Sequence, residues 1–94
     1  MDESGRLKIP EHVLHQNLQG ETVLLDLNGG TYFGLNEVGT RFWELVGIHG
    51  RFDAVVDAML EEFEVERAEL ENDLESLVEE LLEKGLLAAG ERAE

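Results

Sequence analysis

Short runs of alternating apolar and polar residues fill the first third of the chain and are typical of β-strands. Three such runs are predicted as strands, at Val13–Leu18, Glu21–Leu27 and Thr31–Leu35. Gln19-Gly20 suits a tight turn after the first run, and Asn28-Gly29-Gly30 offers the positive φ angles of a two-residue hairpin turn after the second. Because both connections are short, we expect an antiparallel meander.

Apolar residues recur every three or four positions in the rest of the chain, which predicts helices. These helices are expected over Glu37–Val46, Phe52–Phe63 and Glu66–Lys84, with Asn36 capping the first and Gly85 ending the third. A three-stranded sheet is stable only when one of its faces is covered, so the helices should pack on it. The predicted fold class is therefore α+β, with a three-stranded antiparallel sheet followed by three helices.

The two ends of the chain show neither period. We expect a flexible arm over residues 1–10 and a tail over residues 89–94, around one domain of residues 11–88. A chain of 94 residues can bury one small core. No run approaches the roughly 18 apolar residues of a membrane span, and the N-terminus lacks the apolar segment of a secretory signal. We therefore expect no membrane partner, and a cytoplasmic location fits.

Acidic residues dominate the charge. The chain has 22 Asp and Glu against 7 Lys and Arg, for a formal net charge of -15. Nucleic acids and anionic membranes attract basic surfaces, so neither is an expected partner. The charge is typical of a solvated surface, and the alternative is a basic or neutral partner that docks on it.

The residues of common catalytic and metal sites are scarce. There is no cysteine, and no two of His12, His15 and His49 have the four-residue spacing of a helical metal site. Neither Ser4 nor Ser76 lies in a nucleophile motif. We predict no catalytic residue, no metal site, no cofactor and no enzymatic activity.

The third predicted strand is a candidate binding element. Thr31, Phe33 and Leu35 should share one face, and Tyr32 and Gly34 the other. Gly34 has no side chain, so a second backbone could approach it closely. If this strand lies at the sheet edge, its free amides and carbonyls could accept an added strand, or the edge could simply be shielded. Both alternatives remain open at this point.

Two carboxylates lie beside the apolar stripe of the third predicted helix. Asp73 and Glu80 fall among the stripe residues Leu70, Leu74, Leu77 and Leu81. They could pair with a cation from a partner, or with Arg41, Arg51 or Arg67 of the same chain. The sequence leaves this choice open.

Several motifs follow one another in a specific order. The first set is Val23-Leu24-Leu25-Asp26-Leu27, Gly30-Thr31-Tyr32-Phe33-Gly34-Leu35-Asn36, Val38-Gly39 and Phe42-Trp43-Glu44-Leu45. The second set is Phe52–Leu60, Asp73-Leu74, Leu77, Leu81 and Lys84-Gly85-Leu86-Leu87. Together they resemble the family of pyrroloquinoline quinone biosynthesis protein D, over about residues 10 to 88.

That resemblance implies a winged-helix-like domain known as the RiPP recognition element, which is not an enzyme. Such a domain binds the leader segment of a ribosomally made precursor peptide. It presents the peptide to a modifying enzyme such as a radical SAM enzyme, or to a leader peptidase in lasso-peptide members. No cofactor is implied. In the family the leader adds as a strand beside the third strand and lies against the third helix. The implied peptide-binding residues here are Thr31, Tyr32, Phe33, Gly34 and Leu35 on the strand, and Leu70, Asp73, Leu74, Leu77, Glu80 and Leu81 on the helix.

Two other function classes remain as alternatives. A structural module could self-associate through its own edge strand. A winged helix that binds DNA would need Lys and Arg on its recognition helix, whereas Glu66–Lys84 is mainly acidic.

Overall fold

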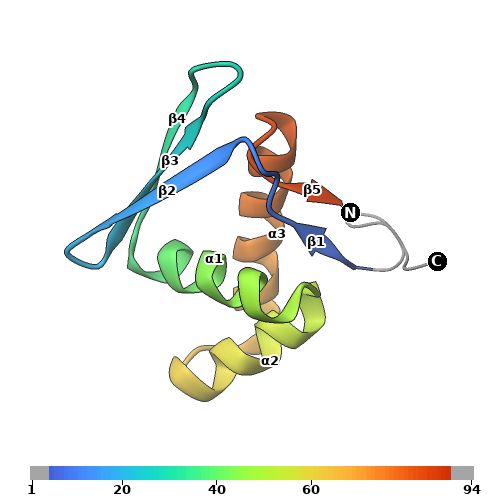
Figure 1. The fold of residues 1–94 in the computed structure, drawn as a ribbon. Coiled ribbons are helices and arrows are strands. Elements are labelled where there is room, and N and C mark those ends of the chain that lie inside the picture. The colour runs from blue at the N-terminus through green and yellow to red at the C-terminus, as the bar shows by residue number, and fades with distance from the viewer. Residues whose placement is uncertain (1–4, 90–94) are drawn as a thin grey trace.

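The computed structural model describes residues 5–89, which form a small sheet packed on three helices (Figure 1). The elements in chain order are β1 (Leu7–Lys8), β2 (Val13–Leu18), β3 (Glu21–Asp26), β4 (Tyr32–Leu35), α1 (Glu37–His49), α2 (Phe52–Glu62), α3 (Arg67–Glu83) and β5 (Ala88–Ala89). Strands β2, β3 and β4 are antiparallel and lie in that order, so β2 and β4 are the two edges. The predicted α+β class is confirmed.

The predicted N-terminal arm and C-terminal tail meet each other in the described structure. Strand β1 pairs with β5 through Leu7 and Ala89, and the Leu7 side chain is only 5% exposed. The Leu7 N–H also donates to the Gly50 carbonyl at 2.9 Å. No sequence pattern predicted β1, because a strand of two residues carries no detectable period. The rest of the predicted arm and tail, residues 1–4 and 90–94, lies outside the described residues.

The connection between β3 and β4 differs from the predicted two-residue turn. It spans residues 27–30, because the Asp26 N–H donates to the Thr31 carbonyl and closes the hairpin there. Only Gly30 has a positive φ, at 74°. The Asp26 side chain stabilises the turn by accepting the Asn28 N–H at 2.9 Å. A local hydrogen bond to this carboxylate thus ends β3 one residue earlier than predicted.

The helices begin and end close to the predicted residues. The Asn36 side chain accepts the Gly39 N–H at 2.9 Å, which confirms the predicted cap of α1. Helix α1 continues through Gly47 to His49 and ends at Gly50, whose φ is 70°. Gly85 adopts a φ of 76° after α3, as a glycine beyond a helix C-terminus commonly does.

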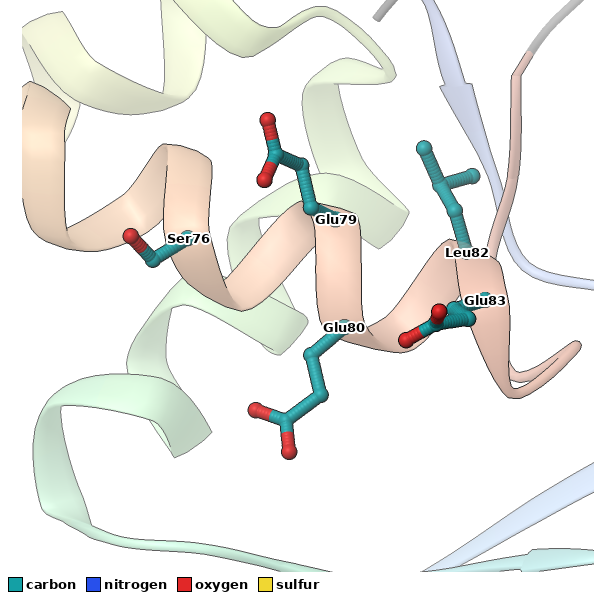
Figure 2. Close-up of a pocket in the computed structure, with 5 residues that line it drawn as sticks. All are labelled: Ser76, Glu79, Glu80, Leu82 and Glu83. Atoms are coloured by element: carbon teal, nitrogen blue, oxygen red, sulfur yellow. The ribbon is translucent and has the colours of Figure 1, made fainter.

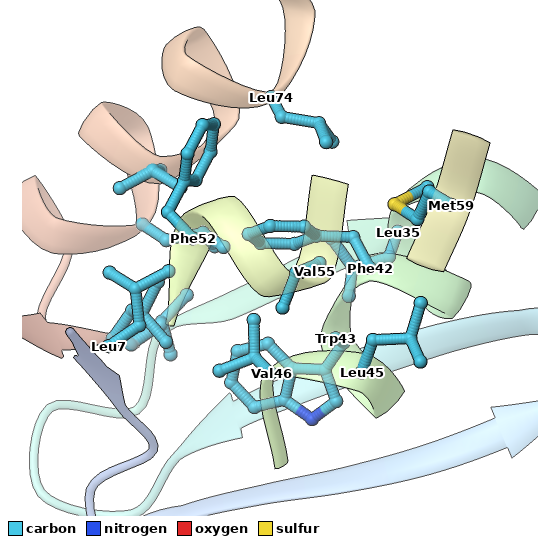
Figure 3. Close-up of a cluster of buried hydrophobic side chains, with 14 of the residues drawn as sticks. Leu7, Leu35, Phe42, Trp43, Leu45, Val46, Phe52, Val55, Met59 and Leu74 are labelled. Carbon is cyan, nitrogen blue, oxygen red and sulfur yellow. The ribbon is translucent and has the colours of Figure 1, made fainter. Parts of the chain in front are cut away.

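The core lies between the inner face of the sheet and the three helices (Figure 3). Phe42 of α1 meets Phe52 of α2 edge to face, with ring centroids 6.4 Å apart. Leu35 at the end of β4 and Leu74 of α3 are both buried in the same cluster. Leu35 and Leu74 also line the candidate site, which lies between β4 and α3.

Candidate functional site

A groove of about 470 Å³ runs between β4 and α3. Its lining brings together six of the predicted site residues, namely Phe33, Gly34, Leu35, Asp73, Leu74 and Leu77. Three further lining residues, Asn36, Val38 and Gly39, come from the start of α1 and were not predicted as site residues. Their position directly after the candidate strand was the available signal, since a helix that starts at the end of an edge strand must flank any groove beside it.

The groove has a rigid floor and an apolar wall. Leu35 and Leu74 are buried and form the floor, while Phe33 and Leu77 are half-buried. Val38 is 38% exposed on the α1 side. A Cβ at Gly39 would lie 3.2 Å from the Leu35 side chain, so the start of α1 approaches β4 very closely. This packing holds the apolar wall in place for a ligand of matching shape.

The remaining predicted site residues lie elsewhere. Leu70 and Leu81 are buried in the core, with Leu81 0% exposed, so their side chains anchor α3 and offer no surface to a peptide. Thr31 and Tyr32 do not line the groove, and the Tyr32 side chain is 71% exposed on the outer face of the sheet. The apolar stripe of α3 is wide enough to cover both core and groove, and its sequence could not separate the two.

Glu80 belongs to a different surface of α3. It lines a shallow, open depression with Ser76, Glu79, Leu82 and Glu83 (Figure 2). In Figure 2 the Glu79 and Glu80 side chains point away from one another. The structure therefore places Glu80 outside the groove that Asp73 lines.

The open edge of β4 carries unused backbone groups. The register pairs Leu24 with Phe33 and Leu25 with Tyr32, and the Asp26 N–H bonds to the Thr31 carbonyl. Hydrogen-bonded pairs alternate along an antiparallel ladder, so Thr31 and Phe33 direct their N–H and C=O groups to β3. The N–H and C=O groups of Tyr32 and Gly34 consequently point to the open edge, beside the groove.

The charge of the groove comes from one side chain. Asp73 is the only charged residue among those that line it. The three arginines that could have paired with Asp73 or Glu80 bind other carboxylates. Arg41 binds Glu44 and Glu62, Arg51 binds Asp53, and Arg67 binds Asp57 and Glu71. The predicted alternative of pairing within the fold is therefore wrong.

The Arg41–Glu62 pair joins α1 to α2 at the protein surface. The Arg41 Nε and Nη2 atoms donate to the two Glu62 carboxylate oxygens at 2.8 and 2.7 Å. These hydrogen bonds lower the pKa of Glu62 below its ordinary value and raise the pKa of Arg41. The bidentate geometry links the first half of α1 to the last residue of α2.

Within residues 5–89, no group of three or more His, Cys, Asp or Glu side chains could hold a metal ion. No helix in that part of the chain is both long and apolar enough to cross a membrane.

Comparison with known proteins identifies the family. A sequence model of the family described as "Coenzyme PQQ synthesis protein D (PqqD)" matches residues 21–87. A solved structure, "TbiB1 in Complex with the TbiA(beta) Leader Peptide", is similar with a TM-score of 0.82 and 39% sequence identity, covering 90% of this chain and 99% of that chain. No curated protein matches the chain. The match covers most of the chain, including β4 and α3, which form the groove. The chain therefore belongs to the PqqD family.

Proposed function

We propose that this protein binds the leader segment of a ribosomally synthesised precursor peptide in the groove between β4 and α3. The observation that carries the proposal is the open edge of β4, where Tyr32 and Gly34 direct unused backbone groups beside an apolar groove. An extended peptide can add to such an edge as a fourth strand. The similarity to TbiB1, whose structure was solved with a leader peptide, supports the proposal.

Backbone hydrogen bonds and side-chain contacts would both contribute to binding. The main-chain hydrogen bonds to Tyr32 and Gly34 hold any extended peptide in register. Alternate side chains of the added strand then turn toward the groove, because successive residues of a strand point to opposite faces. Contacts with Phe33, Val38 and Leu77 select which leader is bound.

In this function the protein itself would catalyse no reaction. Asp73 is the only acid–base side chain of the groove, and no nucleophile lines it. In this function the bound leader holds the rest of the precursor near a separate enzyme, either a modifying enzyme such as a radical SAM enzyme or a leader peptidase. We place this activity in the cytoplasm, where precursor peptides are made.

A titration by amide chemical shifts tests the proposal. Labelled protein is titrated with the TbiA(beta) leader peptide and with leader segments of candidate precursor peptides. We expect saturable shifts in Tyr32–Leu35 and in Asp73–Leu77. Shifts confined to β2, the other edge of the sheet, would contradict the β4 groove. Unchanged spectra with every peptide would contradict leader binding.

Self-association is the second candidate function. Leu14, Leu25 and Tyr32 face one another across the three strands on the outer face of the sheet, and Leu14 is 51% exposed. A second copy could cover this apolar row, although each copy carries a net charge of -15 and repels the other. Sedimentation at several protein and salt concentrations separates the two functions. A dimer that tightens with salt favours self-association, and a monomer throughout opposes it.

A further inference from the structure

The groove is apolar except for one carboxylate. Asn36 also lines it, but its side-chain oxygen already accepts the Gly39 N–H. The Asp73 carboxylate takes part in none of the ion pairs found in residues 5–89. A carboxylate beside apolar surface gains from a cation that the ligand brings, since closing the groove excludes water from around it.

The three arginines considered as partners of Asp73 do not supply that cation. Arg41, Arg51 and Arg67 pair with carboxylates on α1, α2 and α3, none of which lines the groove. Recruiting one of them to Asp73 would break an existing pair. A basic residue of the bound peptide is therefore the complement that fits this site.

The spacing along α3 determines where the peptide needs its neighbouring apolar residue. Asp73 and Leu77 lie one turn apart on α3, a rise of about 6 Å. Same-face residues of a strand are separated by about 6.6 Å. Successive residues of β4 and one turn of α3 line the same groove, so a strand added to β4 would pass beside that turn of α3. Two groove-facing side chains of that strand can meet Asp73 and Leu77 together.

We propose that the leader bound by this protein carries a Lys or Arg that pairs with Asp73, and an apolar residue two positions away that packs on Leu77. The inference rests on the proposed leader-binding function and names the chemistry of the leader. The peptide residue between these two points to the outer face of the sheet, so it contacts neither Asp73 nor Leu77. The recognised segment is thus a basic and an apolar residue separated by one residue.

Selection from a displayed library of random 12-residue peptides tests this inference. The same library is selected against the wild-type protein, against Asp73→Lys and against Glu75→Lys. Glu75 is exposed on α3 outside the groove, so the two variants change net charge equally and differ only in its location. Selected peptides that bind the wild type and lose binding to Tyr32→Pro are groove binders.

We expect groove binders of the wild type and of Glu75→Lys to be enriched in the basic and apolar pair at a spacing of two. Asp73→Lys should select an acidic residue in place of the basic one. A selected peptide should bind Asp73→Lys about tenfold more weakly, and exchanging its Lys for Glu should restore binding. Asp73→Asn, which should weaken binding without the reversal, serves if Asp73→Lys does not fold.

The outcomes separate this inference from the proposed function. Groove binders that lack the basic residue, or that keep it with Asp73→Lys, overturn the inference and leave leader binding standing. A loss of the basic preference in both Asp73→Lys and Glu75→Lys would mean that only the overall charge matters, which also overturns it. Absence of any peptide sensitive to Tyr32→Pro overturns the proposed function itself.

Discussion

Phe33 lies directly opposite Leu24 in the pairing of β3 with β4, and both side chains face the helices. Leu24 is fully buried and Phe33 packs on the core at the rim of the groove. The next residue back along β4, Tyr32, turns to the opposite face of the sheet. One edge strand thus contributes a core side chain, a groove wall and an exposed aromatic ring.

This register predicts that two neighbouring alanine substitutions lower the stability by different amounts. Phe33→Ala should lower the free energy of unfolding by about 2–3 kcal/mol, because it removes a half-buried ring. Tyr32→Ala should lower it by less than about 1 kcal/mol, through loss of the pair with Leu25. Urea unfolding followed by circular dichroism measures both. If Tyr32→Ala is the more destabilising change, the register differs by one residue.

The free amide at the edge predicts that Tyr32→Pro blocks leader binding and leaves the fold intact. The Tyr32 N–H points away from β3, so proline removes a donor to the added strand and none from the existing ladder. Affinity for a leader peptide should fall at least about tenfold, by fluorescence anisotropy. Tyr32→Ala, which keeps the amide, is the matched control. Equal affinity of folded Tyr32→Pro and Tyr32→Ala would rule out strand addition at this residue.

The groove wall predicts that Leu77→Ala weakens peptide binding more than stability. Leu77 is half-buried and lines the groove, so the substitution should lower affinity about tenfold and the free energy of unfolding by about 1–2 kcal/mol. Leu82 is also half-buried on α3 but lies outside the groove (Figure 2). Leu82→Ala should therefore destabilise to a similar extent and keep wild-type affinity. A binding loss shared by both variants would assign the effect to stability alone.

The lowered pKa of Glu62 predicts a stability change that depends on pH. A carboxylate whose pKa is lower in the folded than in the unfolded state stabilises the fold above its ordinary pKa, and this contribution disappears as the pH falls through the folded value. Glu62→Gln should thus be slightly less stable than the wild type at pH 7, and the difference should shrink as the pH falls through the folded pKa of Glu62. Because the pair is exposed, the difference should also shrink at high salt. Urea curves at a series of decreasing pH values provide the measurement, and a difference that does not shrink with falling pH would contradict the ion pair as its cause.

The pairing of β1 with β5 predicts that the first strand is part of the folded domain. Leu7→Ala should lower the free energy of unfolding by about 2–4 kcal/mol, because Leu7 is buried in the core cluster (Figure 3). Lys8→Ala, at the exposed neighbouring position of the same strand, should have little effect. Thermal unfolding of the two variants provides the comparison. Equal stability of both would return these residues to a flexible arm.

The elements of the fold could be predicted because their signals are local. Alternation within Glu21–Asp26 and the stripe of Phe52–Glu62 arise from the backbone geometry of each segment alone. Asn36 was recognisable as a cap for the same reason, since its partner Gly39 is three residues away. Strand β1 could not be predicted, because it forms by pairing with Ala89 at the other end of the chain.

The residues that line the groove could be identified only from the tertiary structure. Leu70, Leu74, Leu77 and Leu81 share one stripe of α3, yet packing buries three of them and leaves Leu77 half-exposed in the groove. Likewise, only the ion pairs of Arg41, Arg51 and Arg67 in the folded chain show that none of these three pairs with Asp73. The sequence by itself determined the strands, the helices and the acidic charge, because these depend on neighbouring residues. The tertiary structure decided which edge is open and which side chains stand beside it, because those depend on how α3 is placed beside β4, about 40 residues earlier in the chain.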